Sequence, residues 1–415
     1  MLDRLRPIAP VLLGLALFDL AQSLVGPLIT LRLGESGVAT ALIGLVNSCY
    51  FIGFLLGSMT CARVIDRVGH IRSFSVFAAV CASTALMHAM AFEPVLWAAL
   101  RAANGWAMSG LFMVVESWLN DKSVPATRGR IFAAYMMVAW FASAIGPLML
   151  NFEQLGTTRL FVLVGLGFVV SLLPMALTQV RNPEIGERRH FGVRRLVEIS
   201  PLGVVACAAA GLINSAYYGL VPIFVQSQGL GAAHVSLVIS SSLVGGMLVQ
   251  YPIGTLSDRF GRRPVLVGAV ALAALCVAGI LMSGGRPFPL LVALGFCFAA
   301  AAAPLYSLGV GQTNDYIERR DFVAASGGLL FAWAFGASLG PVAAAFAMGQ
   351  FGPSMLFVYL LVMLGVVALF ALYRIRRRAG VPLDRQSGFV PGVGTPRGLV
   401  AELDPRSETP PGGSN

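Results

Sequence analysis

Three ionisable side chains, Asp19, Arg101 and Glu116, lie within long apolar stretches of the sequence, where charge is costly. Such groups usually bind a substrate or transfer an ion, so each is a candidate for the chemistry of this chain. Asp19 lies well inside its stretch, and a carboxyl group there could take up and release a proton. Arg101 stays charged and therefore requires a carboxylate, such as Asp19, or an anionic ligand nearby. The alternatives are a helix-packing role for Asp19 and a guanidinium that reaches out to water for Arg101.

Neutral polar and aromatic side chains in the same kind of stretch could complete a binding site. The second half of the chain has no charged residue inside its apolar stretches, so its contacts would come from amides and aromatic rings. Packing is the alternative role for many of these residues, above all for the tyrosines. The candidates are Gln22, Asn47, Asn104, Asn214, Tyr217, Tyr218, Gln250, Tyr306 and Trp333.

The sequence contains no pattern typical of an enzyme or of a metal site. The four histidines are far apart, and no HExxH, GxSxG or paired-cysteine spacing occurs. Lys122 is the only lysine, and no phosphate-binding glycine loop precedes it. We therefore expect neither catalysis nor a cofactor nor a bound metal, and an ion gradient rather than ATP as the source of energy.

The apolar stretches indicate an all-α integral membrane protein. Of the 415 residues, 57% are hydrophobic and 12% charged, which is about half the charge of a soluble domain. The apolar residues form blocks of about 20, long enough to cross a bilayer. Twelve transmembrane helices are predicted, at about 8–32, 40–62, 72–91, 94–118, 130–150, 158–178, 201–226, 234–255, 264–283, 288–312, 323–348 and 353–375.

The placement of positive charge predicts the orientation. Most of the 29 Lys and Arg residues fall in loops at alternate ends of the spans, and positive loops face the cytoplasm. We therefore expect both termini in the cytoplasm and a location in the cytoplasmic (inner) membrane. This placement also explains the net charge of +10 without nucleic acid, since no basic run outside the spans resembles a nucleic-acid-binding motif.

The two sets of six spans resemble each other. Asp66 and Asp258 are 192 positions apart, and Gly69 and Gly261 have the same separation. Two six-helix halves with a site between them are typical of transporters. We expect an N-terminal half at 1–178, a cytoplasmic loop at 179–200, a C-terminal half at 201–378 and a disordered cytoplasmic tail at 379–415.

The loops between the second and third spans of each half carry the most specific motif. The later loop contains Gly254, Asp258, Arg259, Gly261, Arg262 and Arg263 in the spacing G-x-x-x-D-R-x-G-R-[KR]. The earlier loop retains Asp66, Arg67 and Gly69, but Ala62 replaces the first glycine, and His70 and Ile71 replace the basic pair. The fourth span adds R-x-x-N-G through Arg101, Asn104 and Gly105.

With these motifs the chain resembles the major facilitator superfamily, and the run VVESWLND is similar to its YcaD-type branch. The resemblance implies the major facilitator fold and a cavity lined by the spans of Asp19 and Arg101. It also implies that the two loops gate the cytoplasmic mouth, each Asp facing a helix end in the opposite half. Glu116 is expected to pair with the first loop.

Small residues beside proline in the fifth and eleventh spans, Gly146-Pro147 and Gly340-Pro341, predict close helix approach and a bend. They resemble a superfamily motif found in exporters. We expect a monomeric, proton-coupled exporter of a small organic solute, with the lipid bilayer and protons as its other partners. The alternatives are a metabolite importer or uniporter on the same fold and a membrane sensor that transports nothing.

Overall fold

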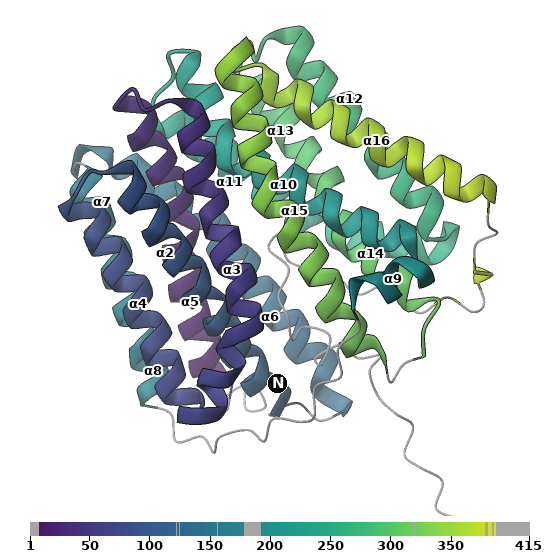
Figure 1. The fold of residues 1–415 in the computed structure, drawn as a ribbon, viewed down its shortest axis with the longest axis horizontal. Helices are drawn as coiled ribbons and strands as arrows, with labels where there is room; N and C mark the ends of the chain where they lie inside the picture. The colour runs from purple at the N-terminus through teal and green to yellow at the C-terminus, as the bar shows by residue number, and fades with distance from the viewer. Residues whose placement is uncertain are drawn as a thin grey trace, which may run out of the picture.

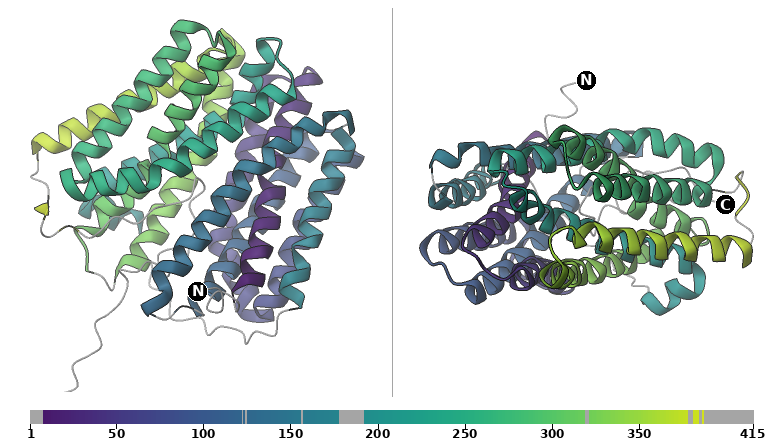
Figure 2. Two further views of the ribbon diagram at one scale, coloured as in Figure 1. Left: turned by 180° about the vertical axis from the view of Figure 1, so that it is seen from behind. Right: turned by 90° about the horizontal axis from the view of Figure 1, so that it is seen from above.

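The computed structural model describes residues 8–121, 123, 125–155, 157–177, 192–318, 321–377, 381–383 and 386. Among these residues the regular structure is helical, with no strand, as the sequence predicts. Two bundles of six spans stand side by side, with the N-terminal half in purple and blue and the C-terminal half in teal to yellow (Figures 1 and 2). Residues 179–191 of the expected loop, and nearly all of the expected tail, lie outside the described residues.

The N-terminal half consists of six consecutive spans, the last two of which are each divided into two helical segments. Their bounds are α2 (Ala9–Glu35), α3 (Thr40–Val68), α4 (His70–Met90), α5 (Pro94–Asp121), α6 (Pro125–Ile145) with the 3-10 segment η1 (Gly146–Leu155), and α7 (Thr157–Val170) with α8 (Leu172–Ala176).

The C-terminal half follows the short helix α9 (Val193–Ile199) and repeats the pattern of six spans. Its bounds are α10 (Pro201–Ser227), α11 (Ala232–Phe260), α12 (Arg262–Ser283), α13 (Phe288–Ala302) with α14 (Leu305–Asn314), α15 (Phe322–Phe351) and α16 (Met355–Arg377).

By length and composition, 11 helical stretches in the described residues could cross a membrane. The remaining span is α5, which is 28 residues long but carries Arg101, Glu116 and Asp121. The outer surface suits lipid, since large apolar side chains such as Leu275 and Leu369 are mostly exposed there. The exception α5 is also the helix that carries two of the three ionisable candidates, Arg101 and Glu116.

Glycine ends the second span of each half. Gly69 and Gly261 have φ values of 84° and 85°, a left-handed conformation that glycine adopts without strain. α3 and α11 continue to these glycines, about one to two turns beyond the predicted ends at 62 and 255. The prediction followed the end of the apolar stretch, whereas a helix can continue beyond the bilayer as long as its backbone hydrogen bonds are made. We call the end of the bundle that carries Gly69 and Gly261 the motif end, and the opposite end the far end.

The Gly-Pro motifs pack in equivalent ways in the two halves. A Cβ at Gly146 would collide with the Leu20 carbonyl and Ser23 of α2, and one at Gly340 with the Leu212 carbonyl and Ser215 of α10. The backbones differ: the span changes to a 3-10 helix at Gly146, whereas α15 stays α-helical through Pro341. The expected close approach is present at both sites.

Candidate functional site

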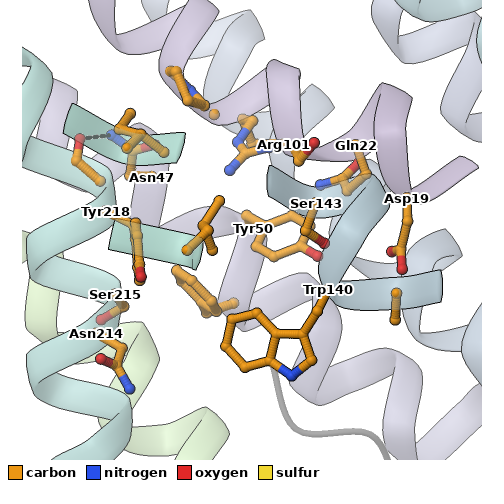
Figure 3. A pocket seen from close by; sticks show the side chains of 18 of the residues that line it. Asp19, Gln22, Asn47, Tyr50, Arg101, Trp140, Ser143, Asn214, Ser215 and Tyr218 are labelled. Atoms are coloured by element: carbon orange, nitrogen blue, oxygen red, sulfur yellow. Dashed lines mark hydrogen bonds between the residues drawn. The ribbon is translucent and has the colours of Figure 1, made fainter. Parts of the chain in front are cut away.

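A cavity of about 180 Å³ lies between the two halves, large enough for a solute rather than a single water. In Figure 3 its N-terminal wall carries Asp19, Gln22, Tyr50 and Arg101, and the opposite wall carries residues of α10. Lining residues are Asp19, Gln22, Ser23, Gly26, Pro27, Asn47, Tyr50, Phe51, Arg101, Phe112, Ala139, Trp140, Ser143, Asn214, Ser215, Tyr218, Gly219, Ile239, Leu243 and Trp333.

Arg101 projects from α5 into this cavity and is only 4% exposed. Its guanidinium lies over the ring of Tyr50, with Cζ 4.5 Å from the ring centroid, and Nη1 donates to Asn104 Oδ1 at 3.4 Å. The Nε atom has no hydrogen-bond partner among the described residues. A buried cation is thus held by an aromatic face and one long hydrogen bond.

Asp19 lies on the α2 face of the same cavity and is also 4% exposed. Gln22, one turn further along α2, lies between Asp19 and Arg101 in Figure 3. The structure brings the two ionisable residues into one cavity, as expected, but does not join them. The described hydrogen bond of the guanidinium goes to Asn104 instead.

The C-terminal half contributes neutral side chains, as expected. Asn214, Ser215 and Tyr218 come from α10, and Trp333 from α15. The Trp333 ring lies edge-on to Phe51, with centroids 5.8 Å apart, so it joins the two halves across the cavity. Ser215 Oγ and Trp333 Nε1 have no hydrogen-bond partner in the described part of the chain.

Four of the neutral polar and aromatic candidates do not line this cavity. Tyr217 faces away from it, because its hydroxyl shares a 2.8 Å hydrogen bond with Ser242 and its ring packs on Phe298. Asn104 lies outside the lining and accepts the hydrogen bond from Arg101. The other two, Gln250 on α11 and Tyr306 on α14, also lie outside the lining.

Several lining residues were not anticipated, and helical spacing could have found them. Ser23 and Gly26 follow Asp19 and Gln22 at steps of three and four, which places all four on one face of α2. Tyr50 and Phe51 follow Asn47 in the same way on α3. Trp140 and Ser143 of α6 are three residues apart and share a helix face, but that face carries no ionisable residue that would indicate a site in the sequence.

Toward the far end of the cavity, hydrogen bonds join the two halves. Asn47 Nδ2 donates to Thr30 Oγ1 at 2.9 Å and to the Gly219 carbonyl at 3.2 Å, and Thr30 donates to the same carbonyl at 3.1 Å. Nearer the far surface, Gln226 Nε2 donates to the Leu31 carbonyl at 3.1 Å. We call the group of Thr30, Asn47 and Gly219 the far-end seal.

A family model described as Major Facilitator Superfamily matches residues 11–233 and 203–401. The chain belongs to this superfamily. It is 31% identical over 384 residues to the "Uncharacterized MFS-type transporter YcaD" of Shigella flexneri serotype 5b, an alignment that covers 90% of this chain and 96% of that protein. The YcaD protein of Escherichia coli O139:H28 matches equally well, with the same identity and coverage.

Solved transporters share the fold at low sequence identity. A mutant form of the nucleoside transporter NupG superposes with a TM-score of 0.77 at 13% identity, covering 88% of this chain and 99% of that one. A bacterial homologue of the human lysosomal transporter Spinster, in an inward-facing and occupied conformation, gives 0.72 at 15% identity, covering 92% and 97%. The likeness to these structures shows the fold, and the family model and the YcaD match show the superfamily.

The second superfamily loop is anchored by a buried ion pair. Arg262 Nε lies 2.8 Å from Asp315 Oδ2, the two side chains are 1% and 2% exposed, and Arg262 Nη1 donates to Ser257 Oγ at 3.2 Å. Arg263 Nη2 donates to the Tyr316 hydroxyl at 2.7 Å. These contacts all lie within the C-terminal half, and those with Asp315 and Tyr316 bind the loop to the end of α14.

The first superfamily loop is anchored differently. His70 takes the place of Arg262 and shares a 2.9 Å hydrogen bond with Ser117 Oγ, while its ring stacks on Trp118. Glu116, one residue earlier on α5, accepts a 2.7 Å hydrogen bond from the Tyr135 hydroxyl of α6. Both contacts lie within the N-terminal half.

The charged residues at the tip of each loop are exposed. These are Asp66 and Arg67 of the first loop and Asp258 and Arg259 of the second, and all four are exposed on the surface in this conformation. Gly254 is buried in α11, close to its end. A gating role for the two aspartates therefore remains a prediction about the state in which the motif end is closed.

Proposed function

We propose that this protein is a monomeric secondary active transporter that moves a small organic solute across the cytoplasmic membrane by alternating access. The observation that carries the proposal is the cavity shared by the two halves, which the hydrogen bonds of the far-end seal join at the far end. If the halves rock, this seal breaks and the motif end closes, so the same cavity faces the other side.

The motif end is proposed to face the cytoplasm, because it carries most of the described arginines, as cytoplasmic loops do. The far end has only a few, Arg32 and Arg286 among them. Arginines at the motif end include Arg63, Arg67, Arg72, Arg130, Arg194, Arg195, Arg259, Arg262, Arg263, Arg374, Arg376 and Arg377. The far-end seal then makes this conformation the one that is open inward.

Asp19 is proposed to carry the coupled proton. It is the one acidic residue in the described lining of the cavity, and a carboxyl group there changes the charge of the site when it gains or loses a proton. Export is proposed as the direction, supported by the Gly-Pro contacts at Gly146 and Gly340, which resemble the exporter motif.

Proton-coupled uptake is the second candidate, and Arg101 favours it. An anion bound to Arg101 and a proton bound to Asp19 would stabilise each other, because each cancels a charge that opposes the other. Groups that bind together cross together, so this arrangement would move solute and proton in the same direction.

Proteoliposomes that contain a pH dye separate the candidates. A small organic solute added outside should raise the internal pH if solute and proton exchange, and should lower it if they move together. Asp19→Asn keeps the shape of the side chain and removes ionisation, so it should abolish the pH change and spare solute–solute exchange. An Asp19→Asn protein with wild-type proton movement would contradict the assignment of Asp19.

A further inference from the structure

We infer that the cavity binds an organic anion with a planar apolar body, an aromatic carboxylate in the simplest case. The inference rests on the proposed function only in taking this cavity as the solute site, and it does not depend on the direction of transport. Three observations carry it: the contacts of Arg101, the unmet hydrogen-bond capacity of the cavity, and the aromatic rings of its walls.

Arg101 is the first observation. A guanidinium stays charged when it is buried, and burying a charge is costly unless an opposite charge compensates it. Here the guanidinium has one 3.4 Å bond to a neutral amide and the face of Tyr50, while Nε–H has no acceptor among the described residues. A bound carboxylate would supply both a compensating charge and the missing acceptor, and it matches the planar guanidinium geometrically.

The unmet hydrogen-bond capacity is the second observation. Four side chains of the cavity have a buried polar atom that lacks a partner in the described part of the chain: Gln22 Oε1, Arg101 Nε, Ser215 Oγ and Trp333 Nε1. Arg101, Ser215 and Trp333 each offer a hydrogen there. A ligand rich in acceptors therefore fits this site better than an ammonium ion, which offers only donors.

The walls are the third observation. Tyr50, Phe51, Trp140 and Trp333 present aromatic rings to the same space, and they come from both halves of the molecule. Rings of this kind pack against a planar body, which would be held between the halves while its carboxylate meets Arg101. A bare inorganic anion would leave these rings without contact.

The test uses the purified full-length protein and a matched panel of probes. The panel contains benzoate, 2-naphthoate and indole-3-acetate, each with its neutral carboxamide and with the amine in which an aminomethyl group replaces the carboxylate. Calorimetry gives the affinities. We expect a carboxylate to bind about tenfold or more tightly than its amide and amine counterparts, since hydrogen bonds to a charged group are roughly twice as strong as neutral ones.

Two variants locate the binding site. Arg101→Gln should remove the preference for the carboxylate over the amide, whereas Arg259→Gln, at an exposed position of the motif end, should keep it. Ser215→Ala, a change that removes only the hydroxyl, should weaken carboxylate binding several-fold and amide binding by less, because a hydrogen bond to a charged acceptor is the stronger one. If Arg101→Gln does not fold, the inference is still tested by the probe series on the wild-type protein and on Ser215→Ala.

Binding of an amide or an amine as tightly as its carboxylate would overturn the inference, and so would the absence of binding by the whole panel. Alternating access is measured separately, through maleimide labelling of Ser143→Cys from either side of the membrane without any ligand. Labelling from both sides with no carboxylate preference would refute the ligand class alone. Labelling from one side only would refute the proposed transport cycle.

Discussion

The two superfamily loops share a backbone turn and differ in how side chains hold it. Gly69 and Gly261 have nearly identical φ values, yet the residue after each glycine differs. Arg262 forms a buried ion pair with Asp315, whereas His70 forms a hydrogen bond with Ser117 and stacks on Trp118. The duplicated sequence has therefore kept the geometry of the turn, while the residue after the glycine forms a buried ion pair in one half and a hydrogen bond with ring stacking in the other.

The opposite asymmetry holds in the cavity. The ionisable lining residues, Asp19 and Arg101, come from the N-terminal half, and the C-terminal half contributes neutral amide, hydroxyl and aromatic groups. The described buried ion pair thus lies at the motif end of the C-terminal half, whereas the ionisable lining residues of the cavity belong to the N-terminal half. The difference suggests a division of labour: the N-terminal half would carry the coupling, and the C-terminal half would supply a rigid, ionically anchored gate.

The largest expected effect concerns the buried ion pair. Arg262→Gln should lower the free energy of unfolding by about 3–5 kcal/mol, because it leaves the carboxylate of Asp315 buried without its charge partner. His70→Gln, the matched change in the first loop, should cost only about 1 kcal/mol through the loss of the hydrogen bond to the Ser117 hydroxyl. Thermal unfolding in detergent measures both.

The double variant Arg262→Met with Asp315→Leu is the control for this comparison. It removes both charges, so it should recover most of the stability lost in Arg262→Gln. Equal losses in Arg262→Gln and His70→Gln would show that the two anchors do not differ in strength.

A smaller effect should be the same in both loops. Gly69→Ala and Gly261→Ala should each cost about 1–2 kcal/mol, because a side chain is strained at these positive φ values. Gly268→Ala is the control, since it lies within α12 and its added Cβ would meet no atom within 4 Å. Unequal costs at Gly69 and Gly261 would mean that the backbone turns are not equivalent.

The smallest expected effect concerns the exposed aspartates. In the state closed at the motif end, Asp258→Asn should weaken attraction to the helix end it faces and raise labelling of Ser143→Cys from that side, by up to about tenfold. Asp66→Asn should do the same more weakly, because its loop lacks the basic pair. Labelling of Asp258→Asn at the wild-type rate would contradict the gating role and would mean that the loop charge only sets the orientation of the protein in the membrane.

The fold could be predicted from sequence because the length of each apolar stretch and the charge of each loop determine the number and orientation of whole helices. The site depends instead on how each helix is rotated about its own axis. Tyr217 and Tyr218 are neighbours, yet Tyr217 packs inside the C-terminal half and Tyr218 lines the cavity. Composition treats them alike. Asp19 and Arg101 were found because charge in an apolar span is conspicuous, but Tyr50 and Trp140 look like ordinary core residues until the helices are placed.

The ion pair between Arg262 and Asp315 was not anticipated for a similar reason. The motif indicates the arginine, but its partner lies 53 positions away, beyond the end of α14. Only the packing of α12 against α14 brings the two side chains together. In the same way, the described hydrogen bond of Arg101 goes to Asn104, since sharing a cavity with Asp19 does not determine which atoms meet.

Alternating access is tested most directly by locking the far-end seal. A Cβ at Gly219 would lie 3.7 Å from that of Asn47, within the range for a disulfide, so Asn47→Cys with Gly219→Cys should cross-link when oxidised. In a background without the six native cysteines, with Ser143→Cys as the labelled site, we expect the cross-linked protein to be labelled from the motif side only, and reduction to restore labelling from both sides. Undiminished labelling from the far side in the cross-linked protein would contradict the rocking of the two halves around this cavity.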